Sequence, residues 1–132
     1  MKNKVKYIIL GMLLIAGIQN TIAQETDSSM SPSDTLVGEW TIDLRPTPEA
    51  DGYYQVFVVT AVEGNTFSGT FYGSPVENGL INRNWDKLYI AFTTSDASND
   101  YYHSGYLENA RLQGISYCPN RAFAAPWTGV KE

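Results

Sequence analysis

From Leu36 onward the chain consists of short runs of β-branched and aromatic residues that are separated by clusters of Gly, Pro, Asn, Asp and Ser. No apolar period of 3.6 residues continues for a dozen positions, so the pattern does not favour helices. We count eight runs, at residues 36–45, 53–62, 66–73, 79–85, 88–94, 101–107, 111–117 and 125–131. Short strands at near-regular spacing, joined by short loops, are typical of an antiparallel meander.

The first and last strands of an eight-stranded meander would be exposed edges if the sheet stayed open. Pairing them closes the sheet into a barrel and removes these edges, so closure is favoured. Glycines inside the runs fit bends at barrel corners, and they stand at positions 38, 69, 73, 105 and 114. An open sandwich of two sheets is the alternative. The predicted fold class is therefore all-β, with a single antiparallel up-and-down meander that closes into a small eight-stranded barrel over residues 36–132.

The first 23 residues have the three-part build of a secretory signal peptide. Lysines stand at positions 2, 4 and 6, an uncharged apolar run follows over residues 7–18, and Ala23 precedes Gln24. The alternative is a retained membrane anchor, but a run of about 12 residues is short of the ~20 that span a bilayer. We expect cleavage after Ala23, a polar leader over residues 24–35, export to the periplasm or the medium, and no stable membrane insertion after cleavage.

Charge and composition exclude several classes of function. Without residues 1–23 the chain carries 6 basic and 14 acidic side chains, a net charge of −8, so a nucleic-acid partner is not expected. The single cysteine, Cys118, cannot form an internal disulfide. It is either buried or able to pair with another molecule, and we expect burial beside Pro119. With one histidine, one cysteine and no clustered carboxylates, the sequence predicts no metal site and no cofactor.

The stretch Gly38-Glu39-Trp40 in the first run resembles the opening of lipocalin-type and avidin-type barrels. The segment from Gly114 to Gly129 likewise looks like the closing hairpin of small exported barrels. The resemblance implies that the tryptophan packs across one end of the barrel and that the lumen binds a small ligand. In lipocalins an arginine covers this tryptophan, and Arg111 and Arg121 are the candidates for that place here, although a solvated loop position is favoured for Arg121. The late tryptophans of the biotin site have no counterpart, so no biotin-binding residues are carried over.

Catalytic residues are not predicted. A triad of His103, Ser104 and Asp100 would need the histidine and the serine to meet, but neighbours on a strand point to opposite faces. We therefore expect His103 to be a surface or wall residue, and we expect the protein not to be an enzyme. His103 and Cys118 form a second candidate pair for catalysis. An enzymatic function is kept as a third hypothesis beside the two given below.

Aromatic residues are the most promising binding feature, because Tyr and Trp combine a flat apolar surface with one polar group. Tyrosines are also ordinary wall residues of sheets. If the barrel holds a ligand, the side chains expected to face it are Trp40, Phe71, Tyr102, Tyr106 and Trp127.

Two functional hypotheses follow. The first is an exported non-enzymatic module that holds a small apolar or amphipathic ligand in the lumen. The alternative is an exported interaction or inhibitor-type protein that has a filled core and binds a protein partner through its Tyr-rich outer face. The size of the lumen-facing side chains discriminates between them, because bulky side chains fill the lumen and leave little room for a ligand. The bulky residues expected inside are Trp40, Phe67, Phe71, Leu88, Phe92 and Trp127.

Overall fold

The computed structural model describes residues 35–132. Nine strands make up this part of the chain: β1 Gly38–Asp43, β2 Tyr54–Glu63, β3 Thr66–Phe71, β4 Ser74–Pro75, β5 Glu77–Asn82, β6 Leu88–Ser95, β7 Asp100–Glu108, β8 Arg111–Cys118 and β9 Phe123–Lys131. A short 3₁₀ turn, Pro119–Arg121, joins β8 to β9. All eight predicted runs are strands, and the additional strand β4 has two residues, too few for an alternating pattern.

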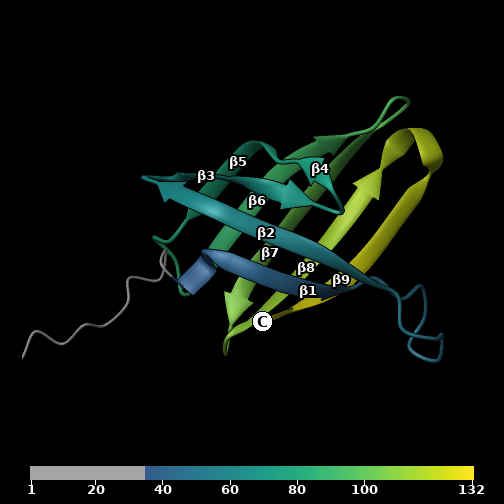
Figure 1. Ribbon diagram of the computed structural model, residues 1–132, viewed down its shortest axis with the longest axis horizontal. Coiled ribbons are helices and arrows are strands. Elements are labelled where there is room, and N and C mark those ends of the chain that lie inside the picture. The colour runs from purple at the N-terminus through teal and green to yellow at the C-terminus, as the bar shows by residue number, and fades with distance from the viewer. Residues whose placement is uncertain (1–34) are drawn as a thin grey trace, which may run out of the picture.

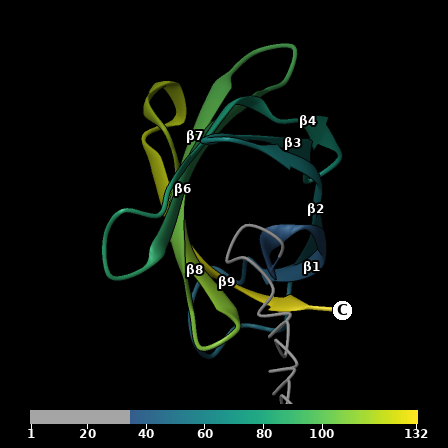
Figure 2. The ribbon, with the colours of Figure 1, turned by 90° about the vertical axis from the view of Figure 1, so that its left-hand side faces the viewer.

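The strands form one closed antiparallel barrel in up-and-down order, as the sequence predicts (Figures 1 and 2). The sheet runs β2-β1-β9-β8-β7-β6-β5-β3, with β4 beside β3, and the pairing of β2 with β3 closes it. Figure 2 shows β6, β7 and β8 on one side of the ring and β2, β3 and β4 on the other. The open sandwich is therefore excluded.

Alternation along each strand divides the side chains between the interior and the outer surface. Strand β6 is the clearest case: Leu88, Ile90, Phe92 and Thr94 are buried, while the residues between them are exposed or half-buried. Because neighbouring strands pair residue by residue, this division continues from β6 to β9.

Aromatic rings fill the interior. The ring centroid of Phe57 lies 5.3 Å from that of Phe71 and 5.2 Å from that of Phe92, and Phe67 packs edge-on to Phe92 at 5.5 Å. All six bulky residues expected inside the barrel are buried. The barrel thus has a packed core in the part where a lipocalin-like ligand would lie.

Trp40 closes one end of the barrel, as predicted, with 1% of its surface exposed. Its Nε1–H donates a hydrogen bond to the Leu36 carbonyl oxygen (2.9 Å). The cation over its ring is Lys131, whose Nζ lies 5.6 Å from the ring centroid; the expectation of Arg111 or Arg121 is wrong. Gly38 has φ +138°, and a Cβ there would lie 2.7 Å from Lys131 Cε, so glycine at this position leaves room for the lysine.

The predicted signal peptide and nearly all of the leader lie outside the described residues. Within residues 35–132, no helix is long and apolar enough to span a membrane.

Candidate functional site

The structure separates the five residues predicted to bind a ligand into two groups. Trp40, Phe71 and Trp127 point into the interior and are almost fully buried. Tyr102 and Tyr106 lie on the outer surface, and 39% of Tyr102 is exposed. The prediction that these tyrosines face the lumen is therefore wrong.

The register of β7 explains the error. His103 pairs with Phe92 on β6 and with Ser116 on β8, and both of these partners face the interior. Since alternate residues share a face, His103 points inward and its neighbours Tyr102 and Ser104 point outward. Both faces of β7 carry aromatic residues, so alternation alone did not identify the inner one. His103 is therefore a wall residue of the barrel that points inward, and the surface position allowed by the sequence is wrong.

A network of hydrogen bonds surrounds His103 inside the barrel, and we call it the interior polar network (Thr94, His103, Ser116 and Trp127). His103 Nε2 lies 2.9 Å from Thr94 Oγ1, and His103 Nδ1 lies 2.6 Å from Ser116 Oγ. Trp127 Nε1–H donates to the same Ser116 oxygen at 2.9 Å. The imidazole packs between Phe71 and Phe92, with both centroid distances 4.5 Å.

The geometry favours one tautomer of His103. The indole nitrogen of Trp127 can only donate, so it occupies an acceptor position of Ser116 Oγ. Among the contacts of Ser116 in residues 35–132, only His103 Nδ1 can accept the hydroxyl hydrogen, which places the ring hydrogen of His103 on Nε2, where it donates to Thr94 Oγ1. Burial lowers the pKa of His103 to about 4, so the ring is neutral at pH 7.

This network ties three strands and a tryptophan together in a place that is closed to solvent. His103 is 5% exposed and Ser116 is 4% exposed. Ser104, the candidate nucleophile beside the histidine, is exposed on the opposite face, and Asp100 accepts a hydrogen bond from Ser95 Oγ (2.7 Å). The proposed triad is therefore not assembled. Cys118 is buried next to Pro119, as expected.

A ring of tyrosines lies at the barrel end opposite Trp40. The hydroxyls of Tyr53 and Tyr72 are hydrogen-bonded to each other, and this bond, together with burial, raises the pKa of Tyr72. Arg121 Nη1 donates to the Tyr101 hydroxyl (3.0 Å), which donates to Asp96 (3.1 Å). Arg121 also stacks over Phe123 at 5.5 Å. The polar groups of these side chains are already paired with one another, and the pairs connect the loops at this end of the barrel.

The outer surface of β6–β9 presents a different chemistry. Its central outward positions, which we call the tyrosine face, are Tyr89, Ala91, Thr93, Tyr102, Ser104, Tyr106, Gln113, Ile115, Tyr117, Ala124, Pro126 and Thr128. None of these side chains carries a charge, although the chain has a net charge of −5. Tyr102 and Tyr117 stack on neighbouring strands at 5.2 Å, and Tyr89 and Tyr106 form a second pair at 6.0 Å.

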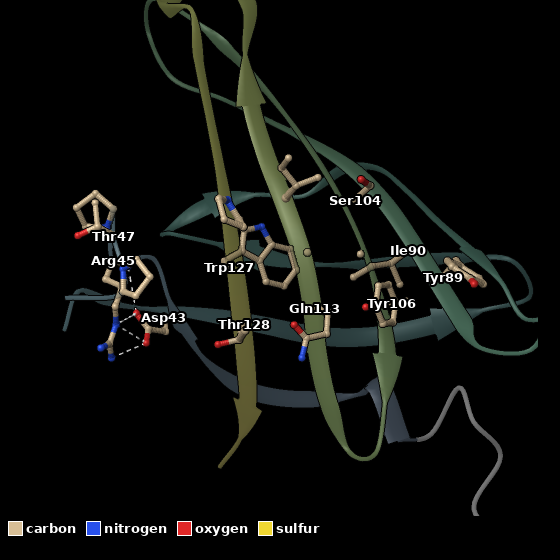
Figure 3. A pocket seen from close by; sticks show the side chains of 16 residues that line it. Asp43, Arg45, Thr47, Tyr89, Ile90, Ser104, Tyr106, Gln113, Trp127 and Thr128 are labelled. Atoms are coloured by element: carbon tan, nitrogen blue, oxygen red, sulfur yellow. Dashed lines mark hydrogen bonds and ion pairs between the residues drawn. The ribbon is translucent and has the colours of Figure 1, made fainter. Parts of the chain in front are cut away.

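A groove of about 830 Å³ crosses this face (Figure 3). Thr128, Gln113, Tyr106 and Tyr89 follow one another across β9, β8, β7 and β6, and they form its floor. The loop 45–48, which contains two prolines, contributes at the β9 end. The volume falls within the range of ligand-binding pockets, roughly 300–1,000 Å³.

Ion pairs flank the groove and neutralise its charged residues. Arg45 Nη2 lies 2.7 Å from Asp43 Oδ2, and the hydrogen bonds that Arg45 donates lower the pKa of this carboxyl. Lys87 lies 3.0 Å from Asp86 and 5.4 Å from the ring centroid of Tyr106. Each cation is paired with an acid, so the groove offers aromatic surface and neutral hydrogen-bonding groups.

Gln113, Ile115, Pro126 and Thr128 were not singled out from the sequence. A usable signal was present: in this acidic chain, the central outward positions of four consecutive strands lack charge, and the outward charged residues Asp100, Glu108 and Arg111 stand at the strand ends. Residues 35–132 contain no group of three or more His, Cys, Asp or Glu side chains placed to hold a metal ion.

Comparisons with protein-family models, with curated proteins and with solved structures find no match to this chain.

Proposed function

We propose that the protein is an exported, non-enzymatic binding module that contacts a protein partner through its tyrosine face. The barrel fold is compatible with a binding module, and the two sequence-based hypotheses differ in where the partner lies. Aromatic rings and the interior polar network occupy the lumen, which argues against a large internal ligand. The outer surface of β6–β9 is the better candidate.

The lack of charge on the tyrosine face is the observation that carries this proposal. Protein interfaces are enriched in Tyr and depleted of Lys, Glu and Asp at their centres. Tyrosine supplies rigid contact area at low entropic cost, while Ser, Thr and Gln supply adaptable hydrogen bonds. Tyr102, Ile115 and Tyr117 each expose about two fifths of their surface, and exposed apolar area of this kind often marks an interaction site.

Site-specific photo-cross-linking in the producing cells tests the proposal. A photoreactive phenylalanine analogue replaces Ile115 on the tyrosine face or, as a control, exposed Thr60 on β2. We expect a cross-linked protein with the probe at position 115 and none at position 60. The double variant Tyr102→Ser/Tyr117→Ser should abolish the product. Equal cross-linking at both positions, or a product that survives the double variant, would overturn the proposal.

Export is part of the proposed function, and the N-terminal pattern of residues 1–23 supports it. Intact mass and N-terminal sequencing of the protein from the periplasm or medium should give a chain that begins at Gln24. A chain that begins at Met1 and fractionates with the membrane would contradict export.

A further inference from the structure

We infer that the groove on the tyrosine face binds an extended, uncharged, proline-containing peptide segment of the partner. This inference rests on the proposed function and specifies the chemistry of the bound segment. It is drawn from the direction of the groove, its length, its lining and its charge.

The direction of the groove decides how a peptide can be held. The barrel is closed, so the described strands offer no long edge to which a peptide could add as a further strand. The groove instead runs across four strands, whose backbone groups are already paired with one another. Recognition must therefore come from side chains, and a peptide without internal hydrogen bonds, such as a polyproline II segment, suits this arrangement.

The length of the groove sets the length of the segment. Asp43 on β1 pairs with Thr128, so the row from Asp43 to Tyr89 covers four strand spacings. At about 4.8 Å per spacing, this row is ~19 Å long. A polyproline II peptide rises about 3.1 Å per residue, so the groove accommodates a segment of roughly six residues.

The lining matches the chemistry of proline-rich segments. Such segments bind grooves that are lined by aromatic residues, and here Tyr89 and Tyr106 form a tilted pair on the floor. Ile115 and Pro126 add aliphatic surface beside them. The side chains of Ser104, Gln113 and Thr128 form no hydrogen bond with other groups of residues 35–132, so they are available to peptide carbonyl groups.

Charge selects against charged segments. Two cations beside the groove, Arg45 and Lys87, are each engaged by a carboxylate. Arg111, on the same face of β8 two residues before Gln113, stands opposite Glu108 on β7, so this end of the face carries an acid as well as a cation. An acidic segment would be repelled by the net charge of −5. A basic segment would have to compete with Arg45 for Asp43. An uncharged segment avoids both costs.

Selection from a phage-displayed library of random dodecapeptides against the folded chain tests this inference. We expect enrichment of uncharged sequences with two or more prolines. The selected peptide, titrated into ¹⁵N-labelled protein, should shift the amide signals of Tyr106, Gln113 and Thr128. Replacement of Tyr106 by Ser together with Gln113 by Ala should weaken binding at least tenfold. Leu80→Ser, an exposed apolar site on β5, is the matched control and should leave binding unchanged.

Three outcomes would overturn the inference: enrichment of charged peptides, no enrichment that depends on Tyr106 and Gln113, or binding of maltohexaose or cellohexaose to the same amides with higher affinity. The cross-linking experiment separates this failure from failure of the proposed function. If the probe at position 115 still captures a partner while no proline-containing peptide is selected, only the inference about the segment is wrong. If both experiments fail, the tyrosine face is not the binding surface.

Discussion

The two faces of strands β6–β9 carry contrasting chemistry on the same backbone. The inner face holds Phe92, His103, Ser116 and Trp127, which are buried and joined by hydrogen bonds and ring contacts. The outer face holds stacked tyrosines and small neutral residues whose side chains remain exposed. One face is specialised for stability, because its polar groups are paired with one another. The other keeps apolar surface exposed to water, and exposed apolar surface of this kind often marks an interaction site.

The largest effect is expected at the closed end of the barrel, on the inner side. Trp40→Ala removes a buried ring and leaves the Leu36 carbonyl without its hydrogen-bond donor. The free energy of unfolding should fall by about 3–5 kcal/mol, the range for large aromatic deletions in cores. Chemical denaturation measures this change. A loss below about 1 kcal/mol would show that Trp40 contributes little to the core.

The pH dependence of stability should report the interior polar network. Folding lowers the pKa of His103 from 6.5 to about 4, so between these values the unfolded chain binds more protons than the folded one. The contribution of neutral His103 to the free energy of unfolding is therefore fully present above pH 6.5. It decreases as the pH falls towards 4, by up to about 3 kcal/mol.

Denaturant titrations at several pH values compare the parent with His103→Gln, which removes the chain's single histidine. The variant should have a weaker dependence of stability on pH in this window. The same slope in both proteins would mean that His103 does not titrate with a lowered pKa.

A smaller effect is expected at Gly114, which faces the interior beneath Trp127. A Cβ at this position would overlap the indole ring, so Gly114→Ala should cost about 1–3 kcal/mol through overpacking. Ile115→Ala, the next residue on the outer face, is the control and should change stability by less than about 1 kcal/mol. Similar losses for the two variants would remove the distinction between the faces.

The smallest effect on stability belongs to the tyrosine face. Tyr117→Ser removes one ring, 43% exposed, of a stacked cross-strand pair, and such pairs contribute roughly 0.2–1 kcal/mol. The thermal midpoint should fall by only a few degrees, whereas cross-linking to the partner should decrease strongly. Loss of folding in this variant would show that the tyrosine face is structural.

The sequence predicted the barrel because turn clusters and β-branched runs are local signals, and all eight runs are strands. It also placed Trp40, Phe71 and Trp127 inside, since apolar residues alternate with polar ones around them. It did not predict which face of β7 points inward, because aromatic residues lie on both faces: His103 on one and Tyr102 on the other. Only the pairing with Phe92 and Ser116 decides that orientation. The groove depends on register across four strands and on the loop 45–48, which no local pattern specifies.

Fluorescence of the two buried tryptophans tests the central claim, a filled interior, most directly. In Trp85→Phe the exposed tryptophan is removed, so the emission comes from Trp40 and Trp127. Titration with a fatty acid and with a retinoid should give no saturable change in this emission, because Phe57, Phe92 and the interior polar network already occupy the lumen. Because Trp127 also lines the groove on the outer face, the additional variant Trp127→Phe leaves Trp40 as the reporter of the interior. Saturable quenching that persists in that variant would place a ligand inside the barrel and contradict the account.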